Sequence, residues 1–304
     1  MIKTIQRSMM ILPVHVQRFV EKAHLRGADA IVLDMEDAVP PNEKIHARDL
    51  VHSSIALVGR GGADVLVRVN NDPDLLDLDL DASIHDGLHA IFVPKVEDKE
   101  DVLGVESMIE SLEHDRGLPP SQIKLAIHIE SPKGLMNLRE IAAASNRIES
   151  MSLGVDDYCL ELGVEPSSQG TELYLPFNMM VHVCKAYGIL PIGVLGSVSG
   201  YQDLAGFEEV AVRGKQLGAT GGYCVHPGQV EVLNRVFSPS KAAIDHARRV
   251  VGVFEAGLKE GRAAVTMDNM MIDTPIYKRA ILVLELADAV ALRESRKQKA
   301  LENI

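Results

Sequence analysis

The sequence predicts an α/β protein, a closed (β/α)8 barrel followed by a helical extension. Two observations support this fold. Eight short, apolar and often β-branched segments, typical of strands buried on both faces, alternate with segments of helical periodicity. This alternation favours parallel βαβ units, and eight of them favour closure into a barrel over an open sheet. Near residue 240 the alternation stops, and only helical patterns follow.

The predicted strands are residues 9–12, 31–33, 65–69, 91–93, 125–129, 151–153, 189–192 and 223–225. Helical stripes lie between them, such as Val16, Phe19, Val20 and Ala23, or Val102, Val105, Ile109 and Leu112. We therefore assign residues 1–239 to a catalytic barrel and residues 240–304 to a C-terminal extension. Within the extension we expect helices at 242–259 and 274–299, joined by a Met-rich, turn-prone stretch at 261–273.

Composition narrows the class of protein. The 304 residues contain 31 Lys and Arg against 43 Asp and Glu, a net charge of −12, which argues against nucleic acid as a partner. The hydrophobic fraction of 46% excludes wholesale disorder. Three cysteines without a CxxC pair support neither a disulfide framework nor a zinc knuckle.

The sequence contains no recognisable signal for secretion or for insertion into a membrane. No secretory signal is visible, and the apolar segment 280–292 is too short to cross a bilayer and carries Glu285 and Asp288. We therefore expect a soluble, cytoplasmic protein that does not associate with a membrane.

Ionisable residues gather where the predicted strands end. In a barrel, the chemistry lies just beyond these carboxyl ends. Buried charges are costly unless they are paired or bind a metal, so a whole rim of them is hard to attribute to packing. The residues are Asp34, Glu36, Asp37, Arg68, Lys95, His128, Glu130, Asp156, Asp157 and His226.

The rim favours a hard cation. Glu130 and Asp157 follow adjacent strands, and Mg²⁺ commonly takes one or two protein carboxylates. His128 shares a strand face with Glu130 and is an alternative ligand, but two rim histidines favour an all-oxygen site. Arg68 is the natural receptor for a carboxylate, because its fork donates two hydrogen bonds. A metal beside an arginine suits a small α-keto or α-hydroxy acid.

An ordered set of motifs resembles the citrate lyase beta subunit family, which includes malyl-CoA and citramalyl-CoA lyases. The matching segments are Arg7-Ser8 with Pro13, LDMEDAVPPNEKIHAR at 33–48, VRVN at 67–70, VPKVE at 93–97, HIESPKGL at 128–135, LGVDD at 153–157, VHPGQVEVLNRVFSP at 225–239 and MIDTPIYKRA at 271–280. Together they cover nearly the whole chain.

The resemblance implies roles for the rim residues. It makes Glu130 and Asp157 the ligands of Mg²⁺, with Asp156 as the neighbour that could replace Asp157. Arg68 would bind the substrate carboxylate, while Glu36 and Asp37 would line the floor of the pocket.

The resemblance also implies roles beyond the rim. Asp273 would be the catalytic acid/base, brought from a neighbouring subunit of a homotrimer or homohexamer. Arg18 and Lys22 would meet the phosphates of coenzyme A, and His226 is a further substrate-binding candidate.

The sequence departs from the family pattern at three places, all on the thioester side of the pocket. They are Pro13-Val14-His15 in place of Pro-Gly-Asn or Pro-Gly-Asp, Gly193 in place of an Asp, and Gly221-Gly222 in place of Gly-Lys.

The implied reaction is the reversible cleavage of a 3-hydroxyacyl-CoA thioester into an α-keto acid and an acyl-CoA. Two alternatives remain open. The lost glycine and lysine are compatible with a thioester-independent pyruvate aldolase. The chain could also be a carrier-dependent subunit of a citrate lyase-type complex, although the resemblance suggests that complex-bound subunits tend to lack the extension.

Overall fold

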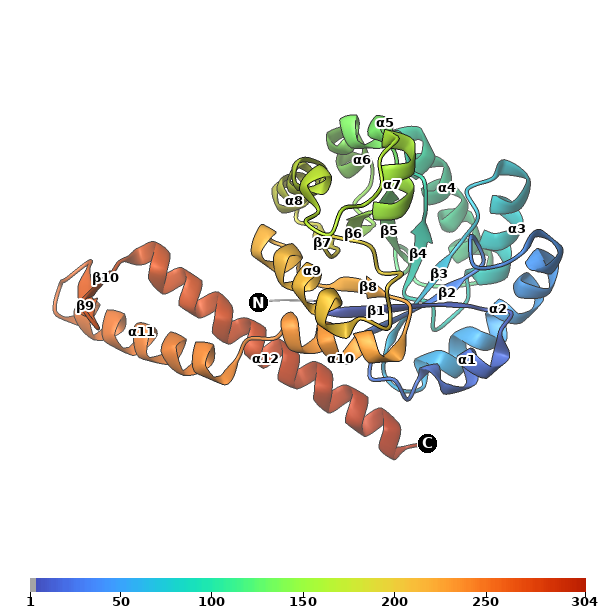
Figure 1. Cartoon of the computed structure of the whole chain (residues 1–304). Coiled ribbons are helices and arrows are strands. Elements are labelled where there is room, and N and C mark those ends of the chain that lie inside the picture. Colours follow the sequence, from blue (N-terminus) through green and yellow to red (C-terminus); the bar gives the residue numbers. More distant parts are fainter. Residues whose placement is uncertain (1–3) are drawn as a thin grey trace.

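Eight parallel strands form the centre of the protein (Figure 1). The structure is a computed structural model that describes residues 4–304. The strand order is β7-β6-β5-β4-β3-β2-β1-β8, and a parallel bridge between Ile192 and Gly221 links the two edges. The sheet is therefore nearly closed into a barrel, which confirms the predicted fold class.

Each predicted strand overlaps an observed one. The strands are β1 (Ser8–Pro13), β2 (Ala30–Asp34), β3 (Asp64–Arg68), β4 (Ala90–Val93), β5 (Lys124–Ile129), β6 (Ile148–Leu153), β7 (Leu190–Ile192) and β8 (Gly222–Cys224). The surrounding helices are α1 (Gln17–Ala23), η1 (Pro41–Glu43), α2 (Lys44–Gly59), α3 (Pro73–Ser83), α4 (Lys99–Asp115), α5 (Pro132–Met136), α6 (Leu138–Ala144), α7 (Val155–Leu162), η2 (Thr171–Leu173), α8 (Tyr174–Tyr187), α9 (Leu204–Leu217) and α10 (Pro227–Val236).

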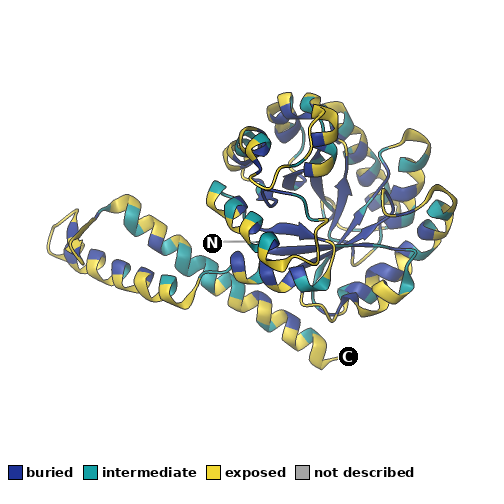
Figure 2. Cartoon of the chain, viewed as in Figure 1, coloured by how far each residue is buried: buried dark blue, intermediate teal, exposed yellow. Residues whose placement is uncertain are grey.

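The strands carry apolar side chains on both faces, which explains their uninterrupted apolar runs. On β2, Ala30 and Val32 face the barrel interior, while Ile31 and Leu33 pack with the surrounding helices. Figure 2 shows the barrel strands mostly buried and the surrounding helices buried on their inner sides. The predicted stripe of α4 is buried at Val102, but in α1 Phe19 is about half exposed.

The extension forms an arm that projects from the barrel (Figure 1). Its helices are α11 (Lys241–Lys259) and α12 (Thr274–Glu302), close to the predicted positions. The stretch between them is more regular than expected, because β9 (Val265–Met267) and β10 (Met270–Ile272) pair as an antiparallel hairpin. Asp268 and Asn269 both have positive φ, at 49° and 61°, as a tight two-residue hairpin turn requires.

A buried ion network fastens the C-terminal half of α12 to the barrel. Asp29, which precedes β2, is fully buried and accepts a hydrogen bond from Lys297 Nζ at 3.0 Å. The Arg7 guanidinium binds the same carboxylate through Nε at 2.7 Å and Nη2 at 2.8 Å. Arg293 of α12 contacts Asp64, the first residue of β3, at 3.0 Å. The helix therefore docks at the amino-terminal ends of the strands.

Two further features concern the chain as a whole. In residues 4–304, no helix is long and apolar enough to cross a membrane. Cys159, Cys184 and Cys224 are free and buried.

Candidate active site

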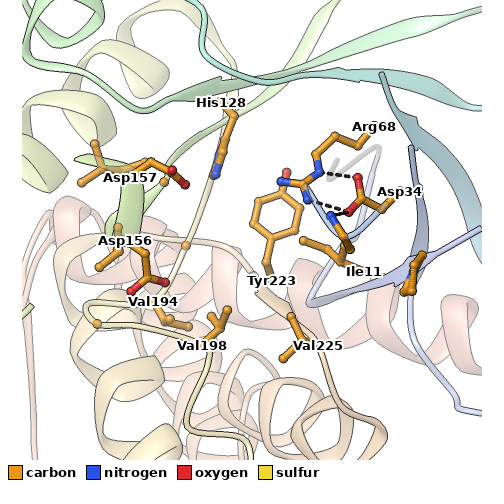
Figure 3. A pocket seen from close by; sticks show the side chains of 17 residues that line it. Ile11, Asp34, Arg68, His128, Asp156, Asp157, Val194, Val198, Tyr223 and Val225 are labelled. Atoms are coloured by element: carbon orange, nitrogen blue, oxygen red, sulfur yellow. Dashed lines mark hydrogen bonds and ion pairs between the residues drawn. The ribbon is translucent and has the colours of Figure 1, made fainter. Parts of the chain in front are cut away.

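A cavity of about 280 Å³ opens at the carboxyl ends of the barrel strands (Figure 3). Residues on or directly after seven of the eight barrel strands contribute to its wall, so its shape depends on the closure of the barrel. The lining residues are Ile11, Pro13, Asp34, Ala38, Arg68, His128, Leu153, Gly154, Val155, Asp156, Asp157, Gly193, Val194, Gly196, Val198, Tyr223 and Val225.

Arg68 reaches this cavity from the end of β3 but is anchored on one side. Its Nε and Nη2 donate to the two oxygens of Asp34 at 2.7 Å and 2.6 Å, and its Nη1 lies 3.2 Å from Glu36. Burial alone would lower the pKa of Arg68, but its bonds to Asp34 raise that pKa above the ordinary value. Arg68 is therefore a permanent, oriented cation in the cavity wall.

Glu36 and Asp37 lie behind this cation and do not line the cavity. Glu36 is buried between Arg68 and the ammonium of Lys95, with which it forms an ion pair. Lys95 also lies 3.3 Å from Asp37, whose side chain is about half exposed. Burial raises the pKa of Glu36, although Arg68 opposes that shift. Both acids thus hold cations in place at the outer edge of the site.

Glu130 follows β5 and is the most isolated acid of the rim. Its side chain is 3% exposed, and its Oε2 has no hydrogen-bond partner among residues 4–304. Burial, followed by the charge of Asp157, raises the pKa of Glu130 to about 8. Such a carboxylate is costly in a folded protein unless a cation neutralises it.

Asp157 and Asp156 lie in the first turn of α7 and both line the cavity. Carboxylates are stabilised there by the positive end of the helix dipole. Asp156 accepts a hydrogen bond from the Ser197 hydroxyl at 3.0 Å. Because Asp156 already has this partner, Asp157 is the better candidate to act with Glu130.

Gly154 explains how the two strand ends come so close. A Cβ at this position would lie 2.6 Å from Cγ of Glu130 and 2.8 Å from Nε2 of His128. Its backbone N–H also donates to the carbonyl of Ile129 at 2.8 Å. The absence of a side chain at Gly154 therefore allows Glu130 and His128 to pack against the start of α7.

Two cavity residues, His128 and Tyr223, pack against the buried ring of Phe92. Phe92 stacks on Tyr223, with ring centroids 5.2 Å apart, and His128 meets Phe92 edge-on at 5.0 Å. Burial, followed by the charge of Arg68, lowers the pKa of His128 to about 3, so the imidazole is neutral near pH 7. Burial also raises the pKa of Tyr223.

The remaining predicted site residues lie outside this cavity. Arg18 and Lys22 are exposed on α1. His226 is exposed, caps α10 through the Gly228 N–H and stacks on Tyr201. Asp273 caps α12 by accepting from the Ile276 N–H at 3.2 Å, and it lies at the end of the arm next to the hairpin (Figure 1).

The set of potential metal ligands is small. In the described part of the chain, no group of three or more His, Cys, Asp or Glu side chains is arranged to hold a metal ion. Glu130 and Asp157 thus remain the candidate pair, and Mg²⁺ commonly takes only one or two protein carboxylates. Tyr223 and Ser152 contribute to the site without having been selected from the sequence, and Asp34 was expected there only as one of the rim acids, with no role of its own.

The fold and the cavity define a class: a barrel enzyme whose acid-rich site lies at the carboxyl rim. Residues 7–227 match the family model described as HpcH/HpaI aldolase/citrate lyase, and the chain belongs to that family. It is 34% identical to the citrate lyase subunit beta of Escherichia coli K12 over 95% of both chains. The expectation of a carbon–carbon lyase is confirmed at the level of the family.

Two further comparisons agree with this assignment. The L-malyl-CoA/beta-methylmalyl-CoA lyase of Cereibacter sphaeroides is 30% identical over 89% of this chain and 91% of that one. The fold resembles that of protein CitE from Mycobacterium tuberculosis, solved in complex with magnesium, acetoacetate and coenzyme A. The TM-score is 0.72 at 22% identity, with 94% of this chain and 100% of that chain covered.

Proposed function

We propose that this protein is a Mg²⁺-dependent lyase that cleaves a 3-hydroxyacyl-CoA thioester of the malyl or citramalyl type. The products are an α-keto acid and an acyl-CoA. The observation that carries the proposal is the buried Glu130 carboxylate, which lacks a partner for Oε2 and lies close enough to Asp157 for that charge to raise its pKa. The named substrates of a malyl-CoA lyase relative supply the substrate class.

The chemistry of the donors fits Mg²⁺. Glu130 and Asp157 offer only oxygen atoms, and the neutral His128 is not needed as a ligand. When bound, the cation withdraws electrons from the substrate's hydroxyl and carboxylate oxygens and lowers the pKa of that hydroxyl. Arg68 would hold the same substrate carboxylate with the N–H groups that Asp34 leaves free.

Cleavage then requires two proton transfers. A base removes the proton of the substrate hydroxyl, the C–C bond breaks, and its electron pair passes to the carbon next to the thioester carbonyl. The keto acid leaves, and an acid protonates that carbon to give the acyl-CoA. We assign this protonation to Asp273, while Glu36 and Asp37 keep Arg68 and Lys95 in place.

Asp273 acts on the site of a neighbouring chain in this proposal. Its own α12 is fastened through Lys297 and Arg293 to the amino-terminal ends of the strands, opposite the rim. Asp273 is 20 residues from Arg293, so the helix carries it ~30 Å away from that anchor. Figure 1 shows the arm projecting away from its own barrel. A homotrimer or homohexamer would bring this arm to another barrel.

Residues near the end of the arm support such docking. Met270 and Met271 are 62% and 63% exposed, and flexible Met side chains adapt well to partner surfaces. Arg18 and Lys22 are exposed on the barrel and do not line the cavity. We assign them to the phosphates of coenzyme A, as the family resemblance implies. His226, beyond β8, remains a candidate contact for the same part of the substrate.

One alternative keeps specific support. The match to a citrate lyase subunit beta spans 95% of that protein, so the extension does not set this chain apart from complex-bound subunits. The sequence argument against a carrier-dependent subunit therefore fails. If the chain is such a carrier-dependent subunit, the purified protein would act on a carrier-bound thioester and not on the CoA form.

The test is a panel of malyl-, methylmalyl- and citramalyl-CoA with the purified protein and Mg²⁺, with keto acid release as the readout. We expect release of glyoxylate or pyruvate from at least one thioester, and none after removal of the cation. Release only from carrier-bound thioesters would favour the subunit alternative. Cleavage of free hydroxy-keto acids without CoA would favour a pyruvate aldolase.

A further inference from the structure

His128, Ser152 and Tyr223 form a polar contact across the otherwise apolar top of the barrel interior. His128 on β5 pairs in register with Ser152 on β6, and Tyr223 lies on β8. Nδ1 of His128 is 2.5 Å from Oγ of Ser152. The buried hydroxyl of Tyr223 interacts with the hydroxyls of Ser152 and Ser150.

These contacts indicate which imidazole nitrogen carries the hydrogen. The Ser152 hydroxyl has one proton, and its acceptors are Nδ1 of His128 at 2.5 Å and the Ile127 carbonyl at 3.3 Å. The shorter contact takes the proton, while Tyr223 can donate its own proton to Ser152. His128 Nδ1 is then an acceptor, and Nε2 carries the N–H.

The N–H of Nε2 has a specific neighbour. Nε2 lies 3.5 Å from Oε1 of Glu130, and a shift of about half an ångström in either side chain would make an ordinary hydrogen bond. Gly154 provides the space, because its missing Cβ would lie within 3 Å of both groups. The opposite tautomer would point a lone pair at this carboxylate.

We propose that His128 is a positioning residue that donates Nε2–H to Glu130 and orients this carboxylate toward the cation. Ser152 and Tyr223 fix the ring and the tautomer of His128. The inference rests on the proposed function only in taking Glu130 as a metal ligand. Groups that orient a metal ligand typically contribute a factor of about 10 to 100 in metal affinity.

The first test measures Mn²⁺ binding by calorimetry on the full-length protein, without substrate. We expect His128→Leu to weaken Mn²⁺ binding by about 10- to 100-fold. His128→Gln keeps an N–H donor and should recover part of the loss, and Tyr223→Phe should weaken binding less than His128→Leu. His182→Leu, on the exposed face of α8, is the matched control and should bind like wild type.

The second test needs no variant. Nitrogen-15 NMR of the wild-type imidazoles should show His128 protonated at Nε2 and unprotonated at Nδ1. A hydrogen on Nδ1, or unchanged Mn²⁺ affinity in a folded His128→Leu protein, would overturn the proposal. Loss of keto acid release from every thioester with normal Mn²⁺ binding would contradict the proposed reaction but leave this inference standing.

Discussion

Arg68 and Asp34 form a two-point ion pair at the end of adjacent strands, with N–O distances of 2.7 Å and 2.6 Å. Asp34 is fully buried and also accepts from the backbone N–H groups of Glu36 and Ala38. The guanidinium is therefore held on a rigid base, with one side turned to the cavity. This relationship determines how the site can distinguish a carboxylate from a neutral group.

The first prediction concerns selectivity at this ion pair. Arg68→Lys keeps the charge but loses the planar fork, so discrimination between glyoxylate or pyruvate and a neutral aldehyde in the condensation direction should fall about tenfold or more. Arg147→Lys is the matched control, because Arg147 forms a similar pair with Glu113 away from the cavity. Unchanged selectivity in Arg68→Lys would remove this residue from the substrate site.

The second prediction concerns the two carboxylates. Glu130→Gln and Asp157→Asn should each lower Mg²⁺-dependent turnover by about a thousandfold while leaving the barrel folded, because both residues lie on the rim. Asp156→Asn should lose far less, since Asp156 bonds to Ser197. Initial rates at saturating Mg²⁺, with circular dichroism as the folding control, decide the matter. Near wild-type rates in either of the first two variants would show the metal assignment to be wrong.

The third prediction is a pH dependence of the metal-free protein. The pKa of Glu130 is about 8 when folded, against an ordinary value of 4.5. The unfolded chain thus loses this proton first, so the group's contribution to stability is full below pH 4.5 and declines as the pH rises toward 8. The difference in unfolding free energy between wild type and Glu130→Gln should change by on the order of 5 kcal/mol across this window, since one pKa unit corresponds to about 1.4 kcal/mol.

Chemical denaturation of both proteins at several pH values measures that difference. Other titrating groups are common to both chains and cancel in the comparison. Saturating Mg²⁺ should remove most of the wild-type decline, because the cation stabilises the ionised carboxylate. A difference that is independent of pH would show that Glu130 is not held in an unfavourable environment.

The fourth prediction concerns the anchoring of the arm. Lys297→Met leaves the buried Asp29 with fewer cations and loosens the end of α12. Amide hydrogen exchange in residues 290–302 should accelerate by about tenfold, while strands β1 to β6 stay protected. Mn²⁺ binding at the rim should not change. Equal acceleration in barrel and arm would mean that the network stabilises the whole fold and not the arm alone.

Much of the fold follows from sequence periodicity. A strand buried on both faces must be apolar throughout, and a charged residue marks the end of the apolar run, as at Glu130 after β5. The hairpin of the arm was not predicted, since its strands have only three residues each and Met is not a typical strand residue. The Asp268-Asn269 pair was the available signal, because Asn and Asp tolerate positive φ.

The site was only partly predictable. Sequence order identified the rim residues but not which of them pair, so Asp34 was indistinguishable from Glu36 and Asp37. Arg68 pairs with Asp34 because the register of β2 with β3 makes these two residues direct partners. The contact between His128 and Tyr223 likewise joins strands that are far apart in the sequence, and it requires barrel closure.

The central claim is that one chain supplies the carboxylates of the rim and another supplies Asp273. The decisive measurement is complementation between Glu130→Ala and Asp273→Ala, each inactive alone. The two proteins are dissociated, mixed in equal amounts and reassembled, and keto acid release is measured. With random assembly, about one quarter of the sites receive both wild-type residues, because each has a probability of roughly one half. Recovery near one quarter of wild-type activity is the predicted result, and no recovery from verified mixed oligomers would contradict a shared site.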